Sequence, residues 1–467
     1  MLTIRRGLTE SAAARLVWTL FAIGLLLSVL LFFRQQVGGD QLNLLARGWL
    51  LAAQGRFIPY GNPMSTGGAN PGGLTSLLVG LPLLLWRDYR APGLVVLAFH
   101  VLAFLILDRA LARVLSARER VLFAVLYWLN PWRVYFSGFL WNPNFLFLFG
   151  AVHLATALAA RRRASFWLSF LHFGSLMLAF QVHASFLLLV VASALLFLRG
   201  YFKVSWPGAV SGALVANVTL VPWIVATLRN PAISAPEHGF PGRGLVLVYP
   251  VLRGVLYLLR YASLSIAGKM GPFDFTMSLG VPADRWLRPL LFFAAEVIGP
   301  LTVLLPLGAW IWLRRRVRRR MGRLPPEASD RAWLYGYLLW TLLAALIVLA
   351  LSPTTFMYWQ GFLLVHAAVL PSVLWLGALS RTRLAPWVSR FTWAYAALEA
   401  LVVLGMAFAS PYYRCGGREP LRLALRYDHE MLHDLGIVEA CPMPLNDPGG
   451  WWPDVLPKAP NPPPDSR

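Results

Sequence analysis

Charged residues are scarce in this sequence. Only 13% of its 467 residues are Asp, Glu, Lys or Arg, against roughly a quarter in an average soluble domain. Cysteine is scarcer still: Cys415 and Cys441 are too few for a zinc or redox framework. These shortages exclude a cytosolic globular enzyme and a secreted disulfide scaffold, and the apolar content described next excludes a disordered chain.

Long apolar runs are what the sequence has in abundance. Apolar residues make up 58% of the chain, and its mean hydropathy is +0.60. Because a membrane-spanning helix needs about 20 mostly apolar residues, the runs predict about eleven spans. The predicted spans are 15–33, 92–108, 121–137, 144–160, 164–181, 184–199, 208–228, 290–313, 333–351, 361–379 and 391–409. We therefore expect an all-α polytopic membrane protein.

A further apolar run, 73–86, is only about 14 residues, which is about 21 Å of helix. The positive-inside rule decides whether it crosses. If it does not cross, every arginine cluster falls on the cytoplasmic side, and if it crosses, every cluster moves outside. The clusters are 109–120, 161–163, 199–203, 314–320 and 381–383. We predict that 73–86 is a re-entrant or interface helix on the outer face.

This topology divides the chain into two parts. Residues 1–409 form a transmembrane domain whose outer loops are 34–91, 137–144 and 229–289, and the segment 245–263 is expected to be a second interface helix. Residues 410–467 form a small, Pro-rich outer tail whose end we expect to be disordered. Cys415 and Cys441 both lie in the tail, where a disulfide and two free thiols remain equal alternatives.

The formal net charge of +22 allows two interpretations. In a soluble protein such a charge would indicate binding to nucleic acid. In a membrane protein, arginine clusters mark cytoplasmic loops. We therefore expect no nucleic-acid partner.

The first outer loop holds the main candidate for chemistry. Apolar residues recur at helical spacing from Leu42 to Ala53, which predicts an amphipathic helix lying on the membrane surface. Asp40 stands at its N-cap position and Gly55 follows its end. Asp40 is either a cap alone or a catalytic carboxylate at the outer mouth of the membrane. The two roles are compatible, because capping fixes the direction of a carboxylate.

Three motifs follow one another at the predicted outer face. The first is Asp40-Gln41 with the surface helix and the Gly-Gly element before 73–86. The second is the segment 137–144, Ser-Gly-Phe-Leu-Trp-Asn-Pro-Asn, and the third is Gln181-Val182-His183. In this order they resemble the outer-face loops of GT-C glycosyltransferases, and more narrowly the bacterial protein-mannosyltransferase-like family 39 group. The resemblance covers about residues 1–230.

The resemblance implies a GT-C-like fold with outer-face interface helices and a multi-pass enzyme of the cell inner membrane. Such an enzyme moves a hexosyl or pentosyl group from a polyprenyl-phosphate donor to an acceptor glycan, lipid or protein at the periplasmic face. Asp40 is expected to be the general base. The expected polar lining is Gln41, Asn142, Asn144, Gln181 and His183, and the arginines expected to face the lipid phosphate are Arg243, Arg253 and Arg260.

Each assignment has a plainer alternative. The arginines can contact ordinary anionic lipid or snorkel, and His183 can be a hydrogen-bonded packing residue. Gly138 stands where relatives carry Arg, and the second loop has no Asp or Glu, so we expect no fixed metal site and leave dependence on a divalent metal open. The rival function is a non-enzymatic transporter or flippase of lipid-linked sugars, which predicts broken helices and charges near the midplane.

Overall fold

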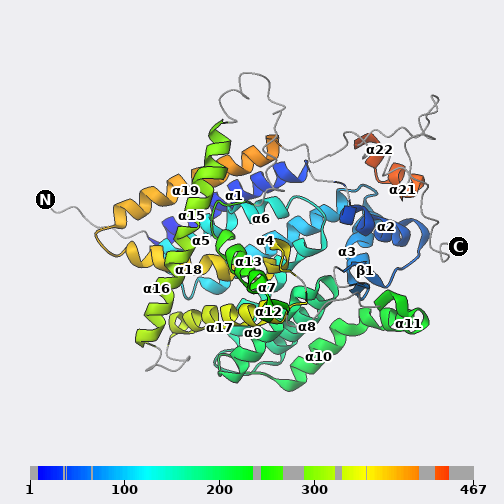
Figure 1. Cartoon of the computed structure of the whole chain (residues 1–467), viewed down its shortest axis with the longest axis horizontal. Helices are drawn as coiled ribbons and strands as arrows, with labels where there is room; N and C mark the ends of the chain where they lie inside the picture. The colour runs from blue at the N-terminus through cyan, green and yellow to red at the C-terminus, as the bar shows by residue number, and fades with distance from the viewer. Residues whose placement is uncertain are drawn as a thin grey trace.

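The computed structural model describes residues 9–34, 37, 39–64, 67–234, 243–266, 289–320, 329–353, 355–409 and 426–440. This part of the chain is a large bundle of helices with a single two-stranded sheet (Figure 1). Cys415, Cys441 and the final stretch of the tail lie outside the described residues.

Eight helical stretches in the described residues are long and apolar enough to cross a membrane. They are Glu10–Phe32 (α1), Ala91–Leu111 (α4), Asn142–Ala159 (ending in α7, Leu146–Ala159), Trp206–Arg229 (α10, Trp206–Asn217, and α11, Val221–Arg229), Pro289–Arg318 (mostly α16, Leu304–Arg320), Asp330–Leu351 (α17), Tyr358–Leu379 (ending in α18, Val365–Leu379) and Ala385–Ala407 (within α19, Ala385–Ala409). The chain is a multi-pass membrane protein, as predicted.

The remaining three predicted spans are helical but shorter or interrupted. Two are the apolar helices α8 (Phe166–Val182) and α9 (Leu187–Leu198). The third is not the continuous helix expected over 121–137. It divides into α5 (Ala117–Phe123), a π-helical turn η1 (Ala124–Trp128) and α6 (Pro131–Phe136). The break falls before Pro131, whose ring nitrogen has no hydrogen to donate to a helix.

A buried arginine compensates for this break. Arg133 has no exposed surface. Its Nε donates to the carbonyl of Trp128 at 2.9 Å, and its Nη1 donates to Oγ of Ser28 in α1 at 2.8 Å. A carbonyl freed inside a membrane must find a donor within the protein, so Arg133 stabilises the interrupted span.

Ion pairs gather the arginine-bearing loops at one end of the bundle. Arg120 bonds Asp108 near the end of α4 at 2.8 Å and lies 4.0 Å from Glu10 at the start of α1. Because α1 leaves this end and α4 returns to it, the residues between them stay at the other end. The helix α3 (Leu74–Leu85), with only 12 residues, therefore does not cross, in agreement with the interface helix predicted from the arginine pattern.

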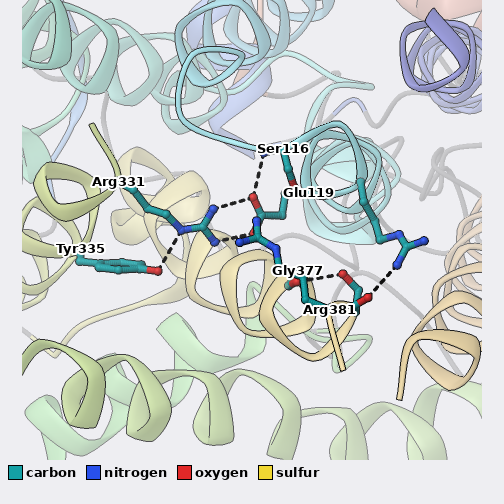
Figure 2. A network of polar contacts seen from close by, with 8 residues as sticks. Ser116, Glu119, Arg331, Tyr335, Gly377 and Arg381 are labelled. Carbon is teal, nitrogen blue, oxygen red and sulfur yellow. Dashed lines mark hydrogen bonds and ion pairs between the residues drawn. The ribbon is translucent and has the colours of Figure 1, made fainter. Parts of the chain in front are cut away.

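The buried carboxylate of Glu119 joins three helices at this arginine end (Figure 2). Arg331, at the start of α17, donates to its two oxygens at 2.9 and 2.5 Å. Arg381, just after α18, lies 3.5 Å away, and the amide of Ser116 donates at 2.9 Å. Gly377 of α18 passes so close to Glu119 that a Cβ there would clash with the carboxylate.

The opposite end carries the first outer loop. The helix α2 (Gly39–Gln54) packs along α3, and the strands β1 (Tyr60–Pro63) and β2 (Ala69–Pro71) pair antiparallel between them. Gly48 and Gly80 mark the close approach of the two helices, because a Cβ on Gly80 would lie 3.1 Å from the carbonyl of Gly48. A side chain at either position would force the helices apart.

Two details of α2 differ from the sequence prediction. The helix begins at Gly39, so Asp40 lies in its first turn rather than at its N-cap. The sequence predicts that the apolar face with Leu42 and Trp49 lies on the membrane surface. In the structure this face is buried within the protein instead. Gly55 does follow the helix, with φ +65°.

Two further described segments are the second predicted interface segment and part of the tail. The second interface segment is present as α12 (Arg243–Val246) and α13 (Val248–Arg260), and α13 packs on α17. The described part of the tail forms α21 (His429–Asp434) and α22 (Ile437–Ala440), which lie beside α2 (Figure 1).

Candidate functional site

A cavity of about 770 Å³ lies at the end of the bundle opposite the arginine loops. Its walls come from the first turn of α2, the two strands, the second outer loop, the start of α9, the end of α17 and the segment 352–360. The polar lining residues are Asp40, Asn62, Asn70, Asn142, His183, Ser185, Ser352 and Gln360, together with the aromatic Trp141, Phe356, Tyr358 and Trp359.

Asp40 is the one carboxylate among the described lining residues. Its side chain is exposed to the cavity, and its Oδ2 accepts a hydrogen bond from Nε1 of Trp141 at 3.0 Å. The amide of Asn62 donates to the main-chain carbonyl of Asp40 at 3.0 Å. The hydrogen bond thus holds Oδ2 of Asp40 in place. Because the carboxylate is rigid, the direction of Oδ1 is fixed as well.

Asp40 and Asn62 form part of the polar wall of the cavity. The cation Arg47 lies directly behind this wall. Nη1 of Arg47 donates to Oδ1 of Asn62 at 2.7 Å, and its guanidinium lies 5.5 Å from the ring centre of Tyr60. Burial lowers the pKa of Arg47, while the nearby tyrosines Tyr60 and Tyr427 oppose that shift. Its reference value is high enough for the side chain to stay charged at neutral pH. The sequence analysis did not select Arg47, although it lies seven residues after Asp40, on the same helical face.

Three of the predicted site residues meet in this cavity: Asp40, Asn142 and His183. The amide of Asn142 donates to the carbonyl of Val182 at 3.1 Å, and Nδ1 of His183 lies 2.9 Å from the hydroxyl of Ser185. Both side chains are therefore oriented by neighbours on the same wall. His183 serves both as a packing residue that ends α8 and as part of the lining.

Asn70 is a lining residue that the sequence analysis missed. It lies in β2 and is 3% exposed, and its Oδ1 has no hydrogen-bond partner among the described residues. A buried acceptor left without a donor is costly, so a ligand with a hydroxyl or amine group in the cavity would stabilise it.

Gln41, Asn144 and Gln181 do not line the cavity. The amide of Asn144 donates to the carbonyl of Phe139 at 2.9 Å, inside the second loop. Gln181 donates to the carbonyl of Ala216 at 2.8 Å and accepts from Thr219 at 2.6 Å, which joins α8 to the end of α10. These two side chains organise the wall from behind.

The predicted phosphate-facing arginines also stand outside the lining. Arg253 lies 3.4 Å from the hydroxyls of Tyr249 and Tyr257, and Arg260 donates to Ser265. Tyr257 contacts the lining residue Tyr358, with ring centres 6.0 Å apart, so both arginines lie one aromatic layer behind the cavity. Arg243 begins α12, and its side chain is outside the described part.

The far side of the cavity is apolar. It is lined by Leu188 and Val191 of α9 and by Ile347 and Val348 of α17. At the rim, the exposed fractions of Leu187 and Leu351 are 46% and 53%. The apolar wall therefore continues onto the outside of the bundle, where hydrocarbon surrounds a membrane protein.

The aromatic rim at 356–360 comes from a connection, at the same end as the first outer loop, that the sequence analysis left out. This short stretch between two predicted spans holds Tyr358 and Trp359. The ring centres of Trp359 and Trp141 lie 5.3 Å apart. The signal that was available is the row of aromatic and amide side chains at the outer end of a span.

No cluster of three or more His, Cys, Asp or Glu side chains suited to a metal ion occurs in the described part of the chain. In the cavity, the ionisable oxygen and nitrogen ligands among the described residues are Asp40 and His183.

Comparison with known proteins gives structural matches only: no family model and no curated protein matches the chain. The structure is similar to ArnT from Cupriavidus metallidurans in the apo state, with a TM-score of 0.54, 14% identity, and coverage of 93% of this chain and 86% of ArnT. It is also similar to ArnT bound to undecaprenyl phosphate, with a TM-score of 0.52, 13% identity, and coverage of 92% and 85%.

An apo oligosaccharyltransferase from Archaeoglobus fulgidus gives a TM-score of 0.47 at 12% identity, over 90% of this chain and 59% of that protein. The two ArnT matches show that the chain has the GT-C fold.

Proposed function

We propose that this protein is a membrane glycosyltransferase that moves a sugar from a polyprenyl-phosphate donor to an acceptor at the periplasmic face of the inner membrane. The observation that carries the proposal is the two-sided cavity. Asp40 lies at its polar end, and an apolar wall formed by α9 and α17 runs out toward the surrounding lipid. A lipid-linked sugar has the same two-part character.

The fold supports the lipid part of this proposal. ArnT, a GT-C glycosyltransferase with the same fold, has been crystallised with undecaprenyl phosphate, which is a polyprenyl phosphate. In this chain the wall of Leu188, Val191 and Val348 offers an apolar surface for a prenyl chain entering sideways. Burial of the first prenyl units there would contribute about 25 cal/mol per Å² of apolar surface removed from water.

The polar end fits the sugar part. Pockets for small ligands combine aromatic walls with a few convergent polar groups. Here Trp141, Tyr358 and Trp359 form the aromatic side. The amides of Asn62, Asn70 and Asn142 supply donors and acceptors for hydroxyl groups. This arrangement suits a hexosyl or pentosyl ring.

The reaction follows from the position of Asp40. An acceptor hydroxyl or amine attacks the anomeric carbon and gives its proton to the Asp40 carboxylate. The bond between that carbon and the phosphate oxygen breaks, and the electron pair leaves with polyprenyl phosphate. A base must lie within hydrogen-bond reach of the proton it takes. The hydrogen bond from Trp141 holds Oδ2, which directs Oδ1 toward the acceptor.

The leaving phosphate needs positive charge close to it. Arg47 is a cation one hydrogen bond behind the lining residue Asn62. Arg253 and Arg260 approach from the other side, behind Tyr257. We propose that these three arginines set a positive potential across the cavity rather than all touching the phosphate.

The proposal is tested by transfer of radiolabelled sugar from a polyprenyl-phosphate donor in detergent, with the variant Asp40→Asn. Since a general base contributes about 10²- to 10⁴-fold, we expect a loss of that size. Glu430→Gln is the matched control, because it makes the same change on an exposed residue of the tail. Near-wild-type transfer by Asp40→Asn would remove Asp40 from the mechanism.

The same assay separates the enzyme from a flippase. An enzyme joins donor and acceptor without two compartments, whereas a flippase changes nothing covalently and needs a sealed vesicle. Movement of lipid-linked sugar across vesicles, with no transfer by wild-type protein in detergent, would favour the flippase.

A further inference from the structure

We propose that the described part of the tail, residues 426–440, positions Asp40 by clasping the helix that carries it. This C-terminal clasp contains α21 and α22 and lies beside α2 (Figure 1). The inference rests on the proposed function, since it assigns to the clasp a role in the rate of the transfer reaction.

The clasp is seated firmly on the protein. Its apolar side chains Met431, Leu432, Leu435 and Ile437 are each at most 1% exposed. The amide of Tyr89, just before α4, donates to the carbonyl of Leu435 at 3.0 Å. A segment buried in this way is an integral part of the outer end of the molecule and can transmit a constraint to its neighbours.

The clasp holds the middle of α2 through Asp434. Nε1 of Trp49 donates to Oδ2 of Asp434 at 2.9 Å. The same oxygen lies 3.4 Å from Nη1 of Arg87, which follows α3. One carboxylate therefore joins the two helices of the first outer loop to the clasp, and it holds α2 against rotation about its axis.

The clasp also reaches the first turn of α2. The hydroxyl of Tyr427 donates to Oδ1 of Asn43 at 2.9 Å and lies 3.4 Å from the carbonyl of Gly39. Gly39 has φ +43°, and no atom outside its own stretch of chain lies within 4 Å of the place where its Cβ would be. The backbone just before Asp40 is thus conformationally permissive and open on that side, so Tyr427 supplies a restraint there.

The restraint bears on catalysis because Asp40 must hold its direction toward the acceptor. When a distant substitution moves a catalytic group by about 1 Å, the reaction rate can fall about 10²-fold. Trp141 and Asn62 fix Asp40 from the cavity side, and the clasp fixes α2 through Asn43 and Trp49. Tyr427 and Asp434 are not among the described residues that line the cavity, and they act through α2, so they are positioning residues.

Tyr427→Phe and Asp434→Leu test the inference. Tyr427→Phe removes only the hydroxyl and keeps the ring. Asp434→Asn is the conservative partner of Asp434→Leu, because its amide oxygen can still accept from Trp49. Glu430→Gln in α21 is the matched control. The readouts are kcat and donor KM in the detergent transfer assay, together with hydrogen exchange of the amides in the second turn of α2, which donate to the carbonyls of the first turn.

We expect Tyr427→Phe and Asp434→Leu to lower kcat about tenfold, the loss that corresponds to about one misdirected hydrogen bond. Donor KM should stay within about twofold of wild type. The amides of the second turn of α2 should exchange faster, and Asp434→Asn should restore most of kcat. A purely structural clasp would lower the yield or thermal stability of the protein without this split between kcat and KM.

Unchanged kcat in both variants, with faster exchange in α2, would overturn the positioning role. Unchanged exchange would show that the contacts do not hold α2, and would also overturn it. Failure of the proposed function looks different, because the wild-type protein itself would then show no transfer.

Discussion

The indole N–H of Trp141 donates to Oδ2 of Asp40 at 3.0 Å, which joins two residues 101 positions apart in the chain. The contact connects the first outer loop to the second at the polar end of the cavity. It also places the ring of Trp141 where it meets Trp359 from a third connection. One tryptophan therefore both orients the candidate base and forms the wall beside it.

Trp141→Phe should lower the rate of sugar transfer while leaving the donor bound. Phenylalanine keeps an aromatic wall but has no N–H, so Oδ2 of Asp40 loses its donor. A hydrogen bond to a charged group contributes about 1.5–3 kcal/mol, and we expect kcat to fall at least about tenfold. Steady-state kinetics in detergent measure the effect. A rise in donor KM with unchanged kcat would show that Trp141 binds the substrate instead of orienting Asp40.

Val191→Trp should weaken binding of long-chain donors. The added ring would fill the apolar side of the cavity between α9 and α17, and the donor would lose contact area there. We expect KM for a long polyprenyl-phosphate donor to rise about tenfold, which corresponds to about 1.4 kcal/mol. A donor with one or two prenyl units should be affected much less.

Leu198→Trp is the control for this change, because Leu198 lies at the other end of α9 and is 76% exposed. Equal effects on long and short donors, or equal effects of the two substitutions, would show that the prenyl chain does not follow this wall.

Glu119→Gln should destabilise the protein without changing the chemistry. The carboxylate is buried and holds Arg331 and Arg381 (Figure 2). These residues lie at the arginine end, whereas Asp40 lines the cavity at the other end of the bundle. Removing one partner of a buried ion pair costs about 3 kcal/mol. Thermal unfolding in detergent should shift to a lower temperature, with transfer per folded molecule unchanged. Glu10→Gln is the control, since the side chain of Glu10 is 76% exposed.

Hydropathy and arginine spacing were sufficient to predict the multi-pass helical architecture and the interface helix at 73–86. Both depend on properties that the bilayer imposes on every span. The break before Pro131 was missed because the run was assigned by its overall hydropathy, although Asn130 and Pro131 are a local signal for a helix break. Its stability depends on Arg133 reaching Trp128 and Ser28, a contact between two spans that no local pattern reveals.

The site was partly predictable for a similar reason. Asp40 stands out because a carboxylate at the start of an amphipathic helix is a local signal. Asn62 and Asn70 become lining residues only through the pairing of β1 with β2. The Gly- and Pro-rich sequence does not predict these two strands. Gln181 was placed at the correct end of its helix, but end position does not tell which side of α8 faces the cavity, and its partners are on α10.

The clasp was not foreseen at all. Its residues look like part of a polar tail, and Leu432 and Leu435 are buried. The segment is held by Trp49 of α2 and by Arg87 and Tyr89 after α3, all far earlier in the chain. Such long-range packing carries no periodic signal in a segment as short as α21.

Cysteine labelling should establish which face of the membrane carries the cavity. In a background with Cys415→Ser and Cys441→Ser, we expect Arg162→Cys in the arginine end to react with a membrane-impermeant maleimide only after the cells are permeabilised. Arg56→Cys, an exposed position just after α2, should react in intact cells. The reason is that arginine-rich loops stay on the cytoplasmic side, while α1 and α4 place the first loop at the other end. Labelling of Arg162→Cys from outside would put the cavity at the cytoplasmic face, where a periplasmic transfer reaction could not occur.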